Sequence, residues 1–261
     1  MAKQFFIFIS FLYSCFSYCQ TKPPLILYNN NENIEYTIYY SVIGIYFKAG
    51  TANFKVNLEN FQNQDVYHFT GLGFSNSNYD WIFKVRDKYE SFVTIKDFKP
   101  LFFNRQIEEG KFKHSEQISF DYNKKKAISP KGEYSIPDKV QDVLSSIYFA
   151  RNISYDSFKL GEKIYFDMFL DNELFKAYIK YEGKEILKTK IGSFKTIKFK
   201  PLLIKGTIFK GGETMTVWVT DDQNHIPLKI YTPISVGSIR CEVNSISNNK
   251  FPLTSKIEEK K

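Results

Sequence analysis

The sequence contains few of the residues on which most catalytic and metal sites depend. Its 261 residues include only three cysteines and three histidines. The histidines, His68, His114 and His225, are far apart, and no two of them have the spacing of a metal-binding pair. A Gly-x-Ser-x-Gly elbow and a phosphate-cradling glycine loop are also absent. The sequence therefore predicts no catalytic residue, no metal, no cofactor and no enzyme activity.

Long hydrophobic runs are absent except at the N-terminus, where Phe5–Tyr13 follows a lysine. This run is too short for a membrane-spanning helix, which needs roughly 20 residues. Its length predicts a signal peptide over 1–19, cleaved between Cys19 and Gln20. The alternatives are a lipoprotein acylated at Cys15 or Cys19, or a buried N-terminal strand or helix. Export to the periplasm or cell envelope is the prediction, and no later run predicts a transmembrane helix.

Cleavage would leave a single cysteine, Cys241, so the sequence predicts no internal disulfide. Cys241 alternates with polar residues on the same face as Ile239 and Val243. This position favours a buried, inert thiol, because reactive cysteines need an exposed and electropositive setting.

Positive charge is in excess, with 36 basic and 28 acidic residues and a formal net charge of +8. The lysines are spread along the chain, and in the densest tract, 176–200, they mostly alternate with apolar residues. Such a pattern is typical of a solvated sheet face that resists edge-to-edge aggregation. Because an exported protein rarely meets nucleic acid, we expect no nucleic-acid partner.

The most abundant unusual residues are aromatic: 26 Phe and 18 Tyr bring the aromatic fraction to 18%. Apolar and polar residues alternate with a period of two at 34–41, 81–86 and 164–170, which indicates half-buried strands. Turn residues separate about twelve to fourteen such segments, as in antiparallel meanders. The sequence predicts a mainly β protein with a curved antiparallel sheet or a barrel, closed or half-open.

One segment has a helical period instead. About residues 138–151, the apolar positions follow the stripe of an amphipathic helix, namely Val140, Val143, Leu144, Ile147 and Tyr148. Asp138 is a candidate N-cap, and Arg151 lies in the last turn, where the helix dipole favours a cation. We expect this helix to pack on the sheet or plug the barrel. A role as a partner-binding helix is the alternative.

The domain organisation that follows is simple. After the signal peptide, we expect a linker over 20–32, a single β-rich domain over 33–247 and a flexible tail over 248–261.

A strand, an acidic turn and a second strand that opens with Pro-Leu occur twice. Val93–Leu101 and Val219–Leu228 share this order. Either a common hairpin geometry or an internal duplication explains the repeat.

Asp87, Glu90 and Arg105 lie on neighbouring predicted strands and are candidates for an ion-paired cluster. A structural salt-bridge network is the simpler interpretation. Acid–base chemistry by the two carboxylates is the alternative.

Eight short motifs occur in an order that resembles one known family. They are Gly44 with Gly50, Val85–Ser91, Pro100-Leu101, Val140–Ser146, Gly192–Lys198, Val217–Asp222, Ile226–Leu228 and Val236–Ile239. Over residues 33–247 the chain resembles the exported bacterial domain-of-unknown-function family 3108 (DUF3108). The resemblance implies a mostly antiparallel β protein of the Gram-negative envelope, without an established activity. The hairpins also have a looser similarity to periplasmic lipoprotein-carrier folds.

Two functions are compatible with these features. The excess of phenylalanine favours an interior that holds an apolar ligand, such as a lipid or a lipid-linked glycan. Phenylalanine in place of leucine, in a composition rich in Lys, Asn and Ile, explains the excess equally well. The alternative is a non-enzymatic structural or protein-interaction component of the envelope. A cavity would favour the first and an exposed aromatic patch the second.

Overall fold

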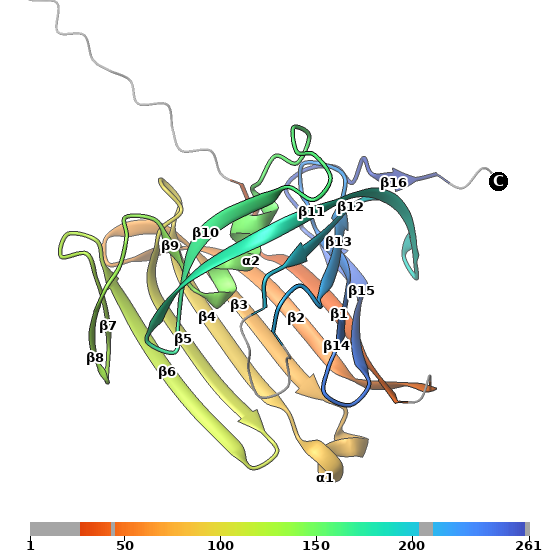
Figure 1. The fold of residues 1–261 in the computed structure, drawn as a ribbon, viewed down its shortest axis with the longest axis horizontal. Helices are drawn as coiled ribbons and strands as arrows, with labels where there is room; N and C mark the ends of the chain where they lie inside the picture. The colour runs from red at the N-terminus through yellow and green to blue at the C-terminus, as the bar shows by residue number, and fades with distance from the viewer. Residues whose placement is uncertain (1–26, 43–44, 204–210, 259–261) are drawn as a thin grey trace, which may run out of the picture.

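A computed structural model of the chain describes residues 27–42, 45–203 and 211–258 (Figure 1). The predicted signal peptide and its cleavage site, Cys19 and Gln20, lie outside these residues. The described part is almost entirely β structure. Its strands are β1 (Glu32–Val42), β2 (Ile45–Phe61), β3 (Gln64–Ser75), β4 (Arg86–Thr94), β5 (Pro100–Glu109), β6 (Phe112–Asp121), β7 (Lys126–Ser129), β8 (Gly132–Ser135), β9 (Val140–Gln141), β10 (Lys163–Leu170), β11 (Glu173–Thr189), β12 (Gly192–Pro201), β13 (Thr216–Thr220), β14 (Pro227–Pro233), β15 (Ser238–Ser247) and β16 (Lys256–Ile257).

Helical structure in the described ranges is confined to two places. A 3-10 turn (Ser77–Tyr79) and α1 (Asp80–Phe83) connect β3 to β4, and α2 (Val143–Arg151) follows β9. None of these helices has the length and apolar character needed to cross a membrane.

All sixteen strands join one sheet, in the order β8-β7-β6-β5-β4-β3-β2-β1-β15-β14-β13-β12-β11-β10-β9, with β16 paired to β12. Neighbouring strands are antiparallel except β9 and β10, which are parallel. The first strand, β1, and the last strand of the main sheet order, β15, pair at the centre of the sheet, where Asn33 faces Ser247. The prediction of a mainly β protein with a curved antiparallel sheet and one amphipathic helix is confirmed.

The sheet curves around α2, which lies between β3–β4 and β9–β10 (Figure 1). On its inner side, Tyr148 of α2 stacks on Phe69 of β3 with 3.7 Å between the ring centroids. A Cβ at Gly71 would lie 3.4 Å from both Leu144 and Phe54, so side chains of α2 and β2 meet over this part of β3. The helix therefore fills one part of the interior of the curved sheet.

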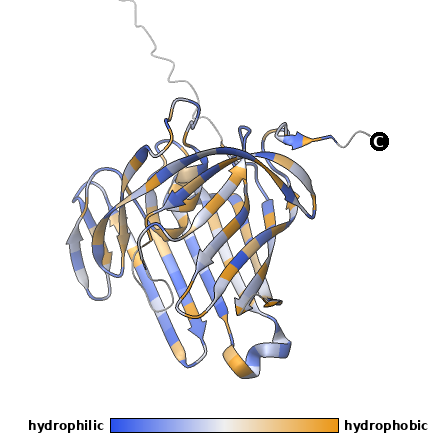
Figure 2. Ribbon diagram, turned by 45° about the vertical axis from the view of Figure 1, so that its right-hand side comes forward, coloured by the Kyte–Doolittle hydropathy of each residue, from blue (hydrophilic) through white to orange (hydrophobic). Residues whose placement is uncertain are grey.

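Alternation along the strands separates a core-facing side from an outer side (Figure 2). The buried apolar side chains form three clusters. The first surrounds α2 and includes Tyr67, Phe69, Phe103 and Ile118; the second includes Tyr155, Ile197 and Val219; and the third includes Ile34, Tyr36, Phe194 and Leu228.

The helix is shorter than the predicted 138–151. Val140 belongs to strand β9, where it pairs with Asp167 of β10. The N-cap is Asp142 and not Asp138: its carboxylate accepts a hydrogen bond from the backbone N–H of Ser145 at 2.7 Å, and the Ser145 hydroxyl accepts one from the N–H of Asp142 at 2.9 Å. This capping box satisfies two backbone donors and so defines the start of the helix. The sequence predicts too early a start for the helix, because Val140 fits the helical spacing of apolar residues by chance.

Arg151, the expected cation of the last turn, is buried and bound to Glu32. Tyr28 lies beside them, and its hydroxyl donates to the carbonyl of Tyr148 at 2.7 Å. Tyr28 and Glu32 are therefore buried, although they lie in the stretch 20–32 for which the sequence suggests a linker. The sequence around Arg151 does not predict that this residue is buried, because the partner that neutralises its charge, Glu32, lies 119 residues away.

The tail expected to be flexible, 248–261, is held against the sheet over its described part. Ser255 is buried, and its hydroxyl donates to Asp222 at 2.6 Å. Lys256–Ile257 pairs with β12. The sequence of this segment does not predict its attachment to the sheet, because the contacts are mostly made by backbone atoms and hydroxyl groups.

The two repeated hairpins are present and share their hydrogen bonds. The hydroxyl of Thr94, at the end of β4, accepts the N–H of Lys99 at 3.0 Å, and that of Thr220, at the end of β13, accepts the N–H of Ile226 at 2.8 Å. In both turns the threonine hydroxyl also donates to an aspartate, Asp97 or Asp222.

Candidate functional site

The face of the sheet that a side chain occupies follows from the contacts of α2. The hydroxyl of Ser91, on β4, donates to the N-cap carboxylate of Asp142 at 2.6 Å, so Ser91 faces the helix. Because strand residues alternate between faces, Tyr89 and Asp87 lie on this inner face and Lys88 and Glu90 on the outer face. The register of β3 to β6 extends the assignment to their neighbours.

An ion-paired cluster lies on the inner face, around Arg105 of β5. Its Nε atom is 2.8 Å from a carboxylate oxygen of Glu116 on β6. Its guanidinium also pairs with Asp171, in the turn between β10 and β11, and lies 3.3 Å from Nε2 of His114. Arg105 thus links the early strands to the β10–β11 hairpin across the curve of the sheet.

His114, Glu116 and Asp171 together place three ligand-type atoms within 4.8 Å of one another, which is the one such group in the described ranges. The residues do not fit a metal ion in this arrangement. The guanidinium of Arg105 contacts all three side chains and already supplies the positive charge that their oxygens and nitrogen require. The cluster is therefore an ion-pair network.

Three carboxyl groups on the inner face have raised pKa values. Burial raises the pKa of Glu116, and the neighbouring Arg105 opposes this effect. Burial and the charge of Glu109 raise the pKa of Asp87 to about 6, and burial also raises the pKa of Glu109. Asp87 accepts a hydrogen bond from the backbone N–H of Glu108 at 3.2 Å. These shifts come from desolvation and from like charge.

The cluster suggested by the sequence does not form as expected. Asp87 and Arg105 share the inner face, but Glu90 lies on the outer face, where it is 3.0 Å from Lys88 and 3.4 Å from His68. The partners of Arg105, Glu116 and Asp171, were not identified from the sequence. The alternation around Glu116 would have placed it opposite Arg105 only if the register of β5 and β6 were known.

The other histidines have separate environments. His68 stacks on Phe92 with 4.1 Å between the ring centroids. His225 lies 2.8 Å from the carbonyl oxygen of Arg151, and burial lowers its pKa, so the neutral ring donates this hydrogen bond. Cys241 is partly buried on β15, and burial raises the pKa of its thiol to about 12, which keeps it protonated.

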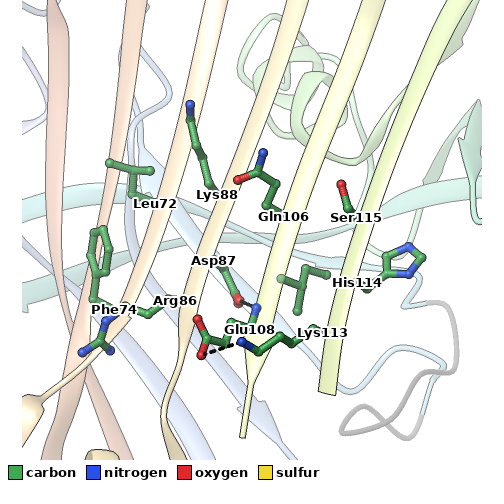
Figure 3. Close-up of a pocket in the computed structure, with 11 residues that line it drawn as sticks. Leu72, Phe74, Arg86, Asp87, Lys88, Gln106, Glu108, Lys113, His114 and Ser115 are labelled. Atoms are coloured by element: carbon green, nitrogen blue, oxygen red, sulfur yellow. Dashed lines mark hydrogen bonds and ion pairs between the residues drawn. The ribbon is translucent and has the colours of Figure 1, made fainter. Parts of the chain in front are cut away.

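A shallow groove of about 620 Å³ crosses β3 to β6 (Figure 3). Most of the residues that line it face outward, and three inner-face residues, Asp87, Ile107 and His114, complete the lining. Leu72 and Phe74 form its apolar side. Polar and charged side chains line most of the rest, and two of them, Lys88 and Lys113, are 44% and 73% exposed. Glu108, on β5, is 3.5 Å from Lys113. Lys88 and Arg86 instead form ion pairs with Glu90 and Asp80, outside the groove. Because these charged groups are partly solvated and already paired, the groove lacks the enclosed, convergent polar groups of a catalytic pocket.

The inner face differs from the groove in that it carries half-buried apolar side chains away from α2. They come from the central β1–β15 pair and from one strand on either side of it, and they are Ile38, Ile107, Ile230 and Ile239. These residues point to the same side as the core but are less enclosed than the core clusters.

Comparison with known proteins agrees with this architecture. The model of a family described as "Protein of unknown function (DUF3108)" matches residues 35–244. Among solved structures, the chain is similar to the crystal structure of a β-barrel-like protein of domain of unknown function DUF1849 from Brucella abortus, with a TM-score of 0.51 and 9% sequence identity. The match covers 84% of this chain and 98% of that chain, and at this identity it shows the fold alone. No curated protein matches the sequence.

Proposed function

The chain belongs to the DUF3108 family of proteins of unknown function, and from its fold we propose that it holds an apolar molecule on the inner face of its sheet. The ligand class is a lipid or a lipid-linked glycan, and the compartment is the bacterial periplasm or cell envelope. The proposed role is binding, without a catalytic step.

The observation that carries this proposal is the set of half-buried apolar side chains on the inner face. Ile38 and Ile239 face inward from neighbouring strands of the central pair, and Ile107 does so from β5. Side chains that face the interior but remain partly exposed leave apolar surface in contact with water. A bound apolar ligand would cover this surface and remove it from water. The ion-paired cluster around Arg105 lies on the same face and offers polar groups to a head group.

Export rests on the sequence of residues 1–19. Intact-mass measurement of the protein from its native envelope should give a chain that begins at Gln20. A mass increment of three acyl chains on Cys15 or Cys19 would instead identify a lipoprotein.

The binding proposal is tested by native mass spectrometry after gentle purification, followed by lipid extraction. We expect the parent protein to carry an apolar molecule. The double variant Ile38→Ser/Ile239→Ser should lose it, whereas Ile186→Ser, at a side chain that is 68% exposed, should retain it. Recovery of the parent protein without any bound molecule contradicts the proposal.

The alternative is a non-enzymatic structural or protein-interaction component of the envelope. The filling of the interior by α2 and the three core clusters favours it, because a filled interior leaves less room for a ligand. An empty parent protein whose inner-face variants are less stable would support this alternative.

A further inference from the structure

One end of the sheet concentrates exposed apolar side chains. Of the fifteen large apolar side chains exposed in the described ranges, ten lie on the connections at this end, the lower edge in Figure 1. We call them the aromatic rim. They are Ile45, Tyr46 and Phe47 at the β1–β2 tip; Phe74, Tyr79, Trp81, Ile82 and Phe83 between the end of β3 and α1; Phe112 after the β5–β6 turn; and Val236 between β14 and β15.

The aromatic rim is held together by contacts between these connections. Phe47 packs on Tyr79 at a centroid distance of 6.4 Å. The ring of Phe83 lies against the β5–β6 turn, where a Cβ at Gly110 would come within 2.9 Å of it. The hydroxyl of Tyr40 donates to the carbonyl of Val236 at 3.0 Å. Four connections, distant in sequence, therefore present one surface.

The most exposed of these side chains are consecutive residues of α1. Trp81 is 83% exposed, Ile82 64% and Phe83 50%. The exposure of three large apolar side chains to water does not stabilise the folded protein. Contiguous exposed apolar patches of this kind mark interaction surfaces.

Basic side chains surround the aromatic rim. Lys48, Lys84, Arg86, Lys111 and Lys113 lie within or next to its connections. Four acidic residues, Asp80, Asp87, Glu108 and Glu109, lie in the same stretches, and Asp80 and Glu108 pair with three of the basic groups. The remaining small excess of positive charge has the sign of the net charge of the whole chain and favours a negatively charged partner.

We propose that the aromatic rim docks on the surface of an anionic lipid bilayer, with Trp81, Ile82 and Phe83 entering the head-group region. The side chains project from hairpin tips and one helical turn, which suits a flat, deformable surface. Peptide partners instead use a groove or a sheet edge. Tryptophan and tyrosine together with flanking lysines are the composition found at membrane–water interfaces. This inference uses none of the half-buried isoleucines on which the ligand-binding proposal rests, so it stands independently of ligand binding.

The test is sedimentation of the full chain with vesicles of phosphatidylethanolamine and phosphatidylglycerol, compared with vesicles of phosphatidylcholine alone. We expect preferential binding to the anionic vesicles, weakened by salt. The triple variant Trp81→Ser/Ile82→Ser/Phe83→Ser should reduce the affinity by about tenfold or more, which corresponds to about 1.4 kcal/mol. Leu160→Ser/Ile186→Ser is the matched control, because these side chains are 75% and 68% exposed elsewhere.

A second readout is local to the aromatic rim. The chain has two tryptophans, so Trp218→Phe leaves Trp81 as the sole indole, and its emission should shift to the blue on anionic vesicles. An unshifted emission, or equal loss of binding in the control, overturns the proposal. Self-association that the triple variant abolishes, without vesicle binding, would also overturn it. Retention of a bound lipid by the triple variant separates this result from the test of the inner face.

Discussion

Arg151, the last residue of α2, holds Glu32, the first residue of β1, in a bidentate ion pair inside the protein. Nη1 lies 2.6 Å from Oε1 and Nη2 lies 3.1 Å from Oε2, and the two side chains are only 3% and 1% exposed. Nε of Arg151 donates to the carbonyl of Asn224 at 3.0 Å. The pair thus ties the start of the sheet and the β13–β14 turn to the helix.

Removing either partner of this ion pair should cost about 3–5 kcal/mol of unfolding free energy, because the remaining charge stays buried without a counter-ion. Arg151→Met and Glu32→Gln test this by urea unfolding. The double variant should cost clearly less than the sum of the single variants, since it leaves no buried charge. Additive costs would show that the two groups do not interact.

Phe69 and Ile38 should respond differently to truncation. Phe69 is fully buried and stacked on Tyr148, so Phe69→Ala should cost about 3–5 kcal/mol. Ile38 is half-buried on the inner face, and Ile38→Ala should cost about 1 kcal/mol while it weakens retention of an apolar ligand. Unfolding and lipid extraction measure the two effects. A large loss of stability in Ile38→Ala would place this residue in the packed core.

Asp87 should make stability depend on pH between about 4 and 6. Its pKa is raised from 3.8 to about 6 in the folded protein, first by burial and then by Glu109. The folded state therefore holds more protons than the unfolded state in this window, and its stability falls as the pH rises through it. Asp87→Asn should be close to neutral near pH 4 and stabilising above pH 6, on the order of 1 kcal/mol.

Chemical denaturation at pH 4 and pH 7.5 measures this difference. Asp138→Asn is the control, because this side chain is 69% exposed. Equal effects of Asp87→Asn at both pH values would show that the carboxyl of Asp87 ionises alike in the folded and unfolded chain.

Arg105→Ala should turn the ion-pair network into a metal site. The substitution removes the guanidinium and leaves the ligand atoms of His114, Glu116 and Asp171 within 4.8 Å of one another. We expect the variant to be less stable than the parent by roughly 3 kcal/mol. Zn²⁺ at about 100 times its dissociation constant should restore about 2.7 kcal/mol. Thermal unfolding with and without Zn²⁺ tests this, and equal stabilisation of the parent protein would contradict it.

The strands and their faces could be predicted from the sequence because alternation is a local property. Residues 34–41 and 164–170 lie in strands as predicted, and the Thr94 and Thr220 turns carry their own hydrogen-bonding residues. The strand predicted at 81–86 is wrong over 81–83, which belong to the helical turn α1, because so short an alternating run does not distinguish a strand from one turn of helix. The family could be recognised from ordered short motifs for the same reason.

The partners of charged residues could not be predicted, because they depend on the register of the strands and on how the sheet curves back on itself. Arg105 meets Asp171 only when the β10–β11 hairpin reaches the early strands. Arg151 meets Glu32 only when α2 packs inside the curved sheet. The aromatic rim has the same origin: Phe47, Trp81 and Val236 are unremarkable in their own segments, and the topology brings their connections to one end.

The pairing of β1 with β15 also sets the moment at which the protein completes its fold. Asn33 faces Ser247, so the middle of the sheet forms only after the ribosome has made β15. Until then β1 lacks one of its two neighbouring strands. Glu32 likewise has no partner until α2, more than a hundred residues later in the chain, supplies Arg151. Long-range closures of this kind slow folding. A nascent chain that stays open until its last strands emerge can still be threaded through a narrow translocation channel, which suits the export that we propose.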